Sequence, residues 1–288
     1  FARNIMCVTT NGQVVIHPIL TKANPSGSPL QVCGPSSAAS EMVRRALFVR
    51  PSSLAVATCN GSVSVLDTDL GRDAEKGKRV CLGFEGEDVT ILSMKQLSKD
   101  DLILSYYCVE DKITTHIIYN MATGDITNLG EVCYGMAEEQ GDDEEEDDLD
   151  WCVELSGAPT ISVAPVPDLK SCLVSSSVCA DLGVIHWDAE QEQYVPIILD
   201  DGVQPVIPLS NYEDVYPHHV CLDFSDTRPV PSRDAASGAP DLVPMPLVYI
   251  VTDDSHLFPF WVVYDKQQSR SPFIAEPVRS VRPTEPCQ

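Results

Sequence analysis

A unit of strand, tight turn and strand recurs five times along the 288-residue chain. The first two copies turn at Asn11-Gly12 and Asn60-Gly61, a dipeptide that favours two-residue hairpins because both of its residues tolerate positive φ. The later copies turn at Glu110-Asp111, Ala180-Asp181 and Asp253-Asp254-Ser255, so the spacings are 49, 50, 70 and 73 residues. Such a period predicts a repeat architecture.

Apolar segments flank every turn, and a shorter apolar segment precedes each hairpin except the first. The predicted hairpin strands are Ile5 to Thr9 with Val14 to Ile19, Leu54 to Thr58 with Ser62 to Leu66, Leu102 to Val109 with Lys112 to Tyr119, Cys172 to Cys179 with Val184 to Trp187, and Leu247 to Thr252 with Leu257 to Tyr264. The preceding segments are Ala46 to Val49, Val89 to Met94, Pro159 to Ala164 and Val220 to Phe224.

Three or four antiparallel strands per unit are typical of β-propeller blades. We therefore expect an all-β fold, a β-propeller with degenerate WD-like blades, of which about four and a half fall in this chain. Only Trp187-Asp188 supplies the dipeptide of a standard WD repeat. A β-sandwich with long loops is the alternative that the pattern leaves open.

The two longer spacings indicate insertions between strands. Residues 138–150 form an acidic loop insertion, and a Pro-rich polar stretch surrounds Arg228 to Pro240. We expect residues 1–264 to form the blades, incomplete at the N-terminus, and residues 265–288 to form a C-terminal extension or tether. Because the chain begins with Phe1, we expect it to be part of a longer protein with more blades upstream.

The charge balance limits the kinds of partner. There are 43 acidic and 19 basic residues, a formal charge of −24, and ten of the carboxylates lie between Glu138 and Asp150. Without that run the charge is still −14, so the folded part is acidic too. Phosphate backbones and anionic membranes are repelled by such a surface. We therefore predict a basic protein partner, with no direct nucleic-acid binding and no membrane insertion.

The eleven cysteines are odd in number and mostly sit singly in apolar strands, as in Met6-Cys7-Val8. This pattern predicts buried free thiols in a reducing compartment. The adjacent His218 and His219 could suggest a metal, but neighbours on a strand point to opposite faces. No catalytic or cofactor-binding motif is present. We predict no cofactor, no metal and no enzymatic activity, with a propeller hydrolase as the remaining alternative.

The segment from Asn211 to Pro217 places tyrosines beside carboxylates. Aromatic residues of this kind are enriched where proteins bind one another. The alternative is a plain solvated connection whose tyrosines pack inwards. Upstream, Asp200-Asp201-Gly202 is most simply a turn.

The last third carries three short motifs in a fixed order. They are Leu222-Asp223-Phe224 at the end of one apolar strand, Pro244-Met245-Pro246 before the next, and Pro259-Phe260-Trp261 in the last. This order resembles the closing blade of the N-terminal propeller in the large phenylalanine-glycine nucleoporin of the pore's cytoplasmic face. Further upstream, Cys133-Tyr134-Gly135 and Ile197 to Gly202 look like inter-blade segments of the same family.

The resemblance implies a seven-bladed propeller that docks the basic RecA-like domain of the DEAD-box mRNA-export helicase. It implies localisation to the nuclear pore complex at the cytoplasmic face of the nuclear envelope, contacts with other nucleoporins through regions outside this chain, and a C-terminal segment that folds back. No Phe-Gly dipeptide occurs, and the acidic insertion matches no family mark. The implied helicase-contact residues are Asn211, Tyr212, Glu213 and Asp214, with Asp200 and Asp201 as weaker candidates.

Overall fold

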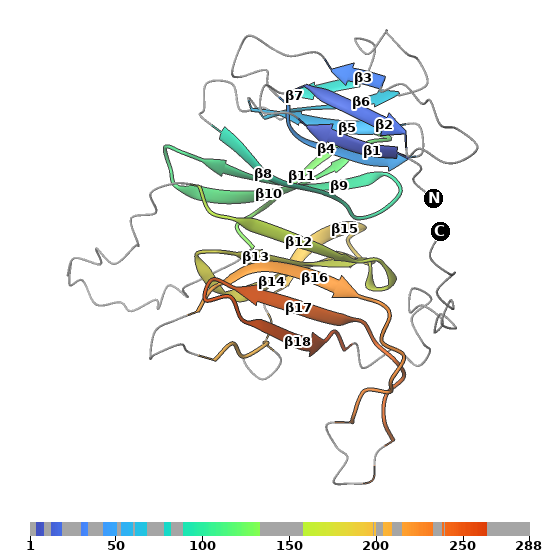
Figure 1. Ribbon diagram of the computed structural model, residues 1–288, viewed down its shortest axis with the longest axis vertical. Helices are drawn as coiled ribbons and strands as arrows, with labels where there is room; N and C mark the ends of the chain where they lie inside the picture. The colour runs from blue at the N-terminus through green and yellow to red at the C-terminus, as the bar shows by residue number, and fades with distance from the viewer. Residues whose placement is uncertain are drawn as a thin grey trace, which may run out of the picture.

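The computed structural model describes eighteen β-strands and one short 3-10 helix, arranged in five antiparallel sheets that follow one another in chain order (Figure 1). The described residues are 4–8, 13–18, 30–33, 43–50, 53–59, 61–67, 78–81, 89–132, 158–197, 199, 204–208, 215–232, 238 and 240–263.

Each sheet is a meander and is called a blade here. Blade 1 holds β1 (Asn4–Val8), β2 (Val14–Pro18) and β3 (Leu30–Cys33), and blade 2 holds β4 (Val43–Arg50), β5 (Ser53–Thr58), β6 (Ser62–Asp67) and β7 (Lys78–Cys81). Blade 3 holds β8 (Val89–Gln96), β9 (Asp101–Cys108), β10 (Ile113–Asn120) and β11 (Ile126–Gly130). Blade 4 holds β12 (Ile161–Val166), β13 (Ser171–Ser176), β14 (Cys179–Asp188) and β15 (Gln193–Ile197), with η3 (Pro167–Leu169) between its first two strands. Blade 5 holds β16 (Pro217–Asp223), β17 (Leu247–Thr252) and β18 (Leu257–Trp261).

The blades pack on one another through matching strands. The first strands of blades 2 to 5, called the inner strands, contact in series: β4 with β8, β8 with β12, and β12 with β16. The outer strands β11 and β15 also contact. Serial packing of four-stranded meanders with first strands adjacent is the blade arrangement of a β-propeller. The chain is therefore an all-β protein of this class, as predicted, and its first and last sheets have three described strands each.

The predicted hairpins are confirmed with one correction. In blade 4 the tight turn lies at Ser177 and Val178, because Ser176 pairs with Cys179. The predicted turn residues Ala180 and Asp181 belong to β14 instead. The register of β13 against β14 shifts between Val174 and Ser176, and this irregularity makes room for the earlier turn.

The central strand of a blade is buried on both faces, so alternate residues enter different cores. In β9, Leu102 and Leu104 join a core with blade 2, while Ile103 and Tyr107 join a second core with blade 4. Burying each such side chain is worth about 1.5–3 kcal/mol. Cys108, Cys172 and Cys179 are free thiols buried in these strands, as expected, whereas Cys221 is free and exposed.

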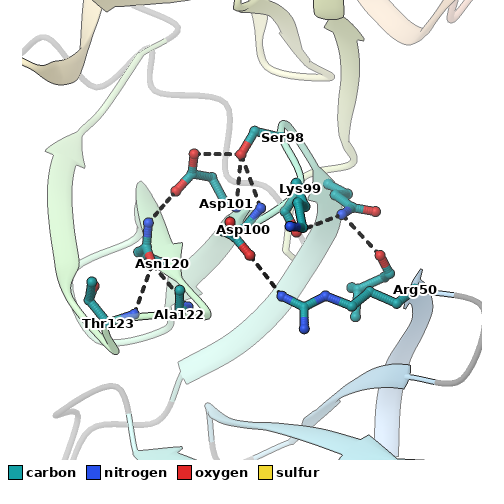
Figure 2. A network of polar contacts seen from close by, with 10 residues as sticks. Arg50, Ser98, Lys99, Asp100, Asp101, Asn120, Ala122 and Thr123 are labelled. Atoms are coloured by element: carbon teal, nitrogen blue, oxygen red, sulfur yellow. Dashed lines mark hydrogen bonds and ion pairs between the residues drawn. The ribbon is translucent and has the colours of Figure 1, made fainter.

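A polar network links blades 2 and 3 at the C-terminal ends of their inner strands (Figure 2). Ser98 Oγ accepts from the backbone N–H groups of Asp100 and Asp101 and donates to Asp101 Oδ2 at 2.6 Å. Asn120 Nδ2 donates to Asp101 Oδ1 at 2.9 Å, which ties the β8–β9 turn to β10. Arg50 Nη2 lies 2.7 Å from Asp100 Oδ1 and joins the turn to blade 2.

Gly183 of β14 lies against the chain that leaves blade 3. A Cβ built on it would stand 2.6 Å from the carbonyl oxygen of Val132, closer than van der Waals contact allows. We therefore expect Gly183→Ala to destabilise the protein by about 1–3 kcal/mol, as overpacking does elsewhere. Urea unfolding would measure the loss, and an unchanged midpoint would show that Val132 can move aside.

His116 of β10 is buried, and burial lowers its pKa to about 4. Its Nδ1 lies 2.9 Å from Ser105 Oγ on the paired strand. The folded state thus holds a neutral ring, whereas the unfolded chain takes up a proton below about pH 6.5. The associated stability is present above pH 6.5 and is lost as the pH falls towards 4.

We therefore expect the wild type to lose about 2 kcal/mol more than His116→Gln between pH 7 and pH 5. Urea unfolding at both pH values measures the difference. His218→Gln, which alters an exposed histidine, is the control and should behave like the wild type. Equal losses in all three proteins would contradict the assignment.

Candidate protein-binding surface

The six predicted contact residues lie outside the described part of the chain. This holds for Asp200 and Asp201 and for Asn211 to Asp214, and equally for the insertion 138–150 and the extension 265–288. These assignments stay predictions. The described chain begins again at Val215, and this end is the part of the region that the structure places.

That end is anchored to the β17–β18 turn. The Tyr216 backbone N–H donates to Asp253 Oδ1 at 3.2 Å, and the Tyr216 carbonyl accepts from the Asp253 N–H at 3.1 Å. The preceding Val215 is buried. These contacts tie Tyr216, which directly precedes β16, to the β17–β18 turn at Asp253.

Hairpin turns from three blades share this end of the molecule. The inner strands β8, β12 and β16 begin where β9, β13 and β17 end, as the strand pairing shows. The β9–β10, β13–β14 and β17–β18 turns therefore lie at one end, called the hairpin-turn end here. It carries the exposed carboxylates of Glu110, Asp111, Asp253 and Asp254 and the exposed apolar side chains of Val109, Ile113 and Val178.

The carboxylates of the β17–β18 turn are held by local hydrogen bonds. Asp254 Oδ1 accepts from Thr252 Oγ1 at 2.6 Å, and Asp254 Oδ2 lies 2.8 Å from His256 Nδ1. The Thr252 hydrogen bond and then the contacts with His256 lower the pKa of Asp254. The turn therefore keeps its negative charge at neutral pH. Carboxylates beside exposed apolar side chains suit a basic protein surface that also buries apolar area.

A cavity of about 80 Å³ opens at the same end between blades 3 and 4. It is smaller than the roughly 300–1,000 Å³ of typical small-molecule sites. It is large enough for ordered water or for part of one side chain. Its lining is mixed: Tyr107, Lys112, Thr114, His116, Glu131, Val132, Pro159, Ile161, Ser176 and Val178.

Two serine–histidine pairs have the spacing of a nucleophile and its base, but their setting is structural. Ser105 and His116 are both fully buried in the sheet. Ser171 Oγ lies 2.7 Å from His186 Nδ1 and also donates to the Leu169 carbonyl at 2.8 Å. Each pair consists of cross-strand neighbours in one blade. They hold adjacent strands together in register.

Metal-binding and membrane-spanning features were sought within the described residues. There, no group of three or more His, Cys, Asp or Glu side chains could hold a metal ion. His218 and His219 are both exposed on β16. In the same part of the chain, no helix has the length and apolar character needed to cross a membrane.

Comparison with known sequences gives one nucleoporin. The chain is 30% identical over 110 residues to Nucleoporin nup146 of Schizosaccharomyces pombe. The match covers 36% of this chain and 8% of nup146, so the chain spans less than a tenth of the relative that it matches. No family model matches the sequence. The chain is thus a β-propeller with sequence similarity to a nucleoporin.

Solved structures of similar shape share little sequence with the chain. The Cps50 (Swd1) β-propeller domain of Myceliophteria thermophila superposes with a TM-score of 0.49 at 10% identity, over 91% of this chain and 67% of that one. Hsv2 of Kluyveromyces lactis superposes with a TM-score of 0.40 at 11% identity, over 69% and 57%. The fold assignment rests on the strand order and blade packing of the chain itself.

Sequence reasoning missed the apolar part of the hairpin-turn end. Val109 and Ile113 flank the β9–β10 turn. Val178 lies in the β13–β14 turn, which the sequence pattern predicts at Ala180-Asp181 instead. Apolar residues directly beside a tight turn are the signal that could have revealed them. Asp253 and Asp254 were recognised as turn residues but not as part of a surface.

Removing the Asp253 anchor should loosen the segment before β16. In Asp253→Ala the Tyr216 N–H loses its side-chain acceptor, so we expect its hydrogen exchange to quicken at least tenfold, the loss of about 1.4 kcal/mol of protection. Asp253→Asn keeps an oxygen acceptor and is the matched control. Exchange monitored by NMR or mass spectrometry measures both, and equal rates in the two variants would show that the bond has no anchoring role.

Proposed function

We propose that this chain is a nucleoporin propeller that acts as a protein-binding platform and docks a DEAD-box RNA helicase at the cytoplasmic face of the nuclear pore during mRNA export. The observation that carries the proposal is the 110-residue similarity to a nucleoporin. The helicase partner and the cytoplasmic face are proposed from the resemblance of the closing blade to the propeller of the cytoplasmic-face nucleoporin.

The charge and the hairpin-turn end support this role. A formal charge of −24 attracts a basic RecA-like domain and repels RNA. The hairpin-turn end carries the exposed carboxylates of Asp253 and Asp254, and the proposed contact residues Glu213 and Asp214 would add two more negative charges to the docking surface. The acidic edge of this protein would then compete with RNA for the same helicase surface. Such binding gains speed from electrostatic steering and weakens with salt.

A binding platform needs no catalytic site. The cavity is small, and the serine–histidine pairs are part of the sheets. Localisation at the nuclear pore follows from the same similarity. The alternative is an acidic propeller scaffold for another basic partner, which the surface chemistry supports equally well because charge alone does not specify the helicase.

Charge reversal distinguishes the helicase proposal from the scaffold alternative. We expect the purified export helicase to bind the wild-type chain at low salt and to bind Glu213→Lys, Asp214→Lys at least tenfold more weakly. The matched control is Glu190→Lys, Glu192→Lys, which makes the same charge change at the exposed β14–β15 turn and should retain most of the affinity. Titration by fluorescence anisotropy at two salt concentrations measures all three proteins.

Each result has a distinct meaning. Loss of binding only in the 213/214 variant supports both the partner and the contact segment. An equal loss of helicase affinity in both variants would show that binding depends on net charge alone. The assignment of Glu213 and Asp214 as contact residues would then be wrong. A folded wild type that binds no helicase at low salt would overturn the helicase proposal in favour of a scaffold with another basic partner.

A further inference from the structure

Positive charge is concentrated on the inner strands of an otherwise acidic chain. Of the eight Lys and Arg side chains that the structure describes, five lie on β4, on β8 or in the turn after β8. The charged or titratable residues of the four inner strands are basic except for Asp223 at the end of β16. The five are Arg44, Arg45, Arg50, Lys95 and Lys99.

Irregular pairing accompanies the basic residues of the inner strands. In β4 the register against β5 shifts between Val43 and Arg45, which leaves Arg44 out of the ladder. In β8 the register against β9 shifts between Ile91 and Ser93, which leaves Leu92 out. Bulges of this kind redirect side chains and free backbone groups.

The freed Leu92 carbonyl fixes the neighbouring guanidinium. Arg45 donates to Leu92 O through Nε at 3.1 Å and through Nη2 at 2.9 Å, and its Nη1 donates to the Arg44 carbonyl at 3.3 Å. These acceptors are neutral, so they orient the charge of Arg45 without cancelling it. Arg44 and Arg45 therefore form a preorganised pair of like charges that would favour an anion.

Among the described residues, the pair has no carboxylate partner. Arg50 is paired with Asp100, but within the same residues no ion pair involves Arg44 or Arg45, and the side chains of both reach solvent. Partial burial and, after it, the charge of Arg44 lower the pKa of Arg45. Arg44 and Arg45 are called the basic edge below.

We propose that the basic edge is a docking surface for the acidic run of this same chain, Glu138 to Asp150. Charge complementarity is the first reason: the run carries ten carboxylates, and the basic edge has no carboxylate partner among the described residues. The position of the run along the chain is the second reason, because both of its attachment points lie at the end of the molecule where Arg44 and Arg45 are found.

The attachment points follow from the topology. The run is joined on one side to Val132, after β11, and on the other to Ala158, before β12. Val132 lines the cavity at the hairpin-turn end, and β12 begins at that end. Arg44 and Arg45 stand at the start of β4, whose first residue pairs with the last residue of β5. The attachment points of the run and the two arginines therefore lie at the same end of the molecule.

The available chain length is sufficient. Glu138 is six positions after Val132, and Ala158 is eight positions after Asp150. Extended chain spans up to about 3.3–3.6 Å per residue, so the two arms reach about 20 and 27 Å. Facing sheets lie about 10 Å apart, so blade 2 is about 20 Å from blade 4. The run can therefore reach β4 without any change in the blades.

Tethering favours this occupant over a free anion. A separate polyanion is repelled by the charge of −24 as it approaches the molecule. The run is covalently attached, so it does not have to approach from solution. A short linker gives an effective concentration of the order of millimolar. Docking would also hide the basic edge from RNA, and it would make the charge of the hairpin-turn end more negative towards a basic partner.

The test uses the full 288-residue chain with the ten run carboxylates changed to their amides. The probe is a fluorescent peptide with the sequence of residues 137–151, titrated at low salt with anisotropy as the readout. We expect the neutralised chain to bind the peptide at least tenfold more tightly than the wild type, whose own run occupies the surface. Adding Arg44→Ser should weaken peptide binding at least tenfold; Arg45 is left unchanged because it contributes to folding.

Lys112→Asn is the matched control. It removes an exposed positive charge at the β9–β10 turn, where the backbone has a φ of 58° that asparagine tolerates, and it should lower the affinity less than twofold. Equal peptide affinity in the wild-type and neutralised chains would overturn docking in cis. An equal loss of peptide affinity in the Lys112 control and the basic-edge variant would show that binding depends on the net charge of the chain and not on this surface. Binding of a short RNA but not of the peptide, with the same dependence on Arg44, would make the surface a nucleic-acid site and reject the proposal.

Discussion

The structure depends on sheets that are apolar on both faces. Leu102 and Ile103 are neighbours in β9, yet they enter different cores, because successive side chains of a strand point to opposite faces. A sheet of this kind is stable only when another sheet covers each face, so the blades must stack in series. The described residues of blade 5 show a covered face and an exposed one. Phe260 packs against blade 4, while Leu257 and Trp261 on the alternate face of β18 are exposed.

The same constraint decides where charge can be placed. Ser162 shows how a polar side chain is accommodated between blades, because its Oγ bonds both the N–H and the C=O of Val220 across the β12–β16 contact. Among the described residues, no Asp, Glu, Lys or Arg residue is buried. The described charge therefore gathers on exposed positions, with carboxylates at the hairpin turns and arginines on β4.

The hairpins could be predicted because each has turn chemistry between two apolar runs. The turn of blade 4 was misplaced because Ala180-Asp181 has more conventional turn residues than Ser177-Val178, and tertiary pairing of Ser176 with Cys179 overrides that preference. Outer strands such as β11 were not recognised because they are short and half polar. The basic edge was missed as well, although adjacent arginines in an apolar strand of an acidic chain are a readable signal. The predicted contact residues Asn211 to Asp214 lie outside the described residues, so their assignment stays a prediction.

Contacts between blades join each sheet mainly to its neighbours in the chain, through pairs such as β4 with β8 and β12 with β16. The polar ties across these joints are few, as with Gln96 Nε2 and the Val49 carbonyl at 3.1 Å. In such a nearly one-dimensional array each joint contributes its own share of stability. Under a pulling force along the stack, the joints would therefore yield one after another, each releasing a short length of chain. The molecule would lengthen in steps while the remaining blades kept their shape and their surfaces.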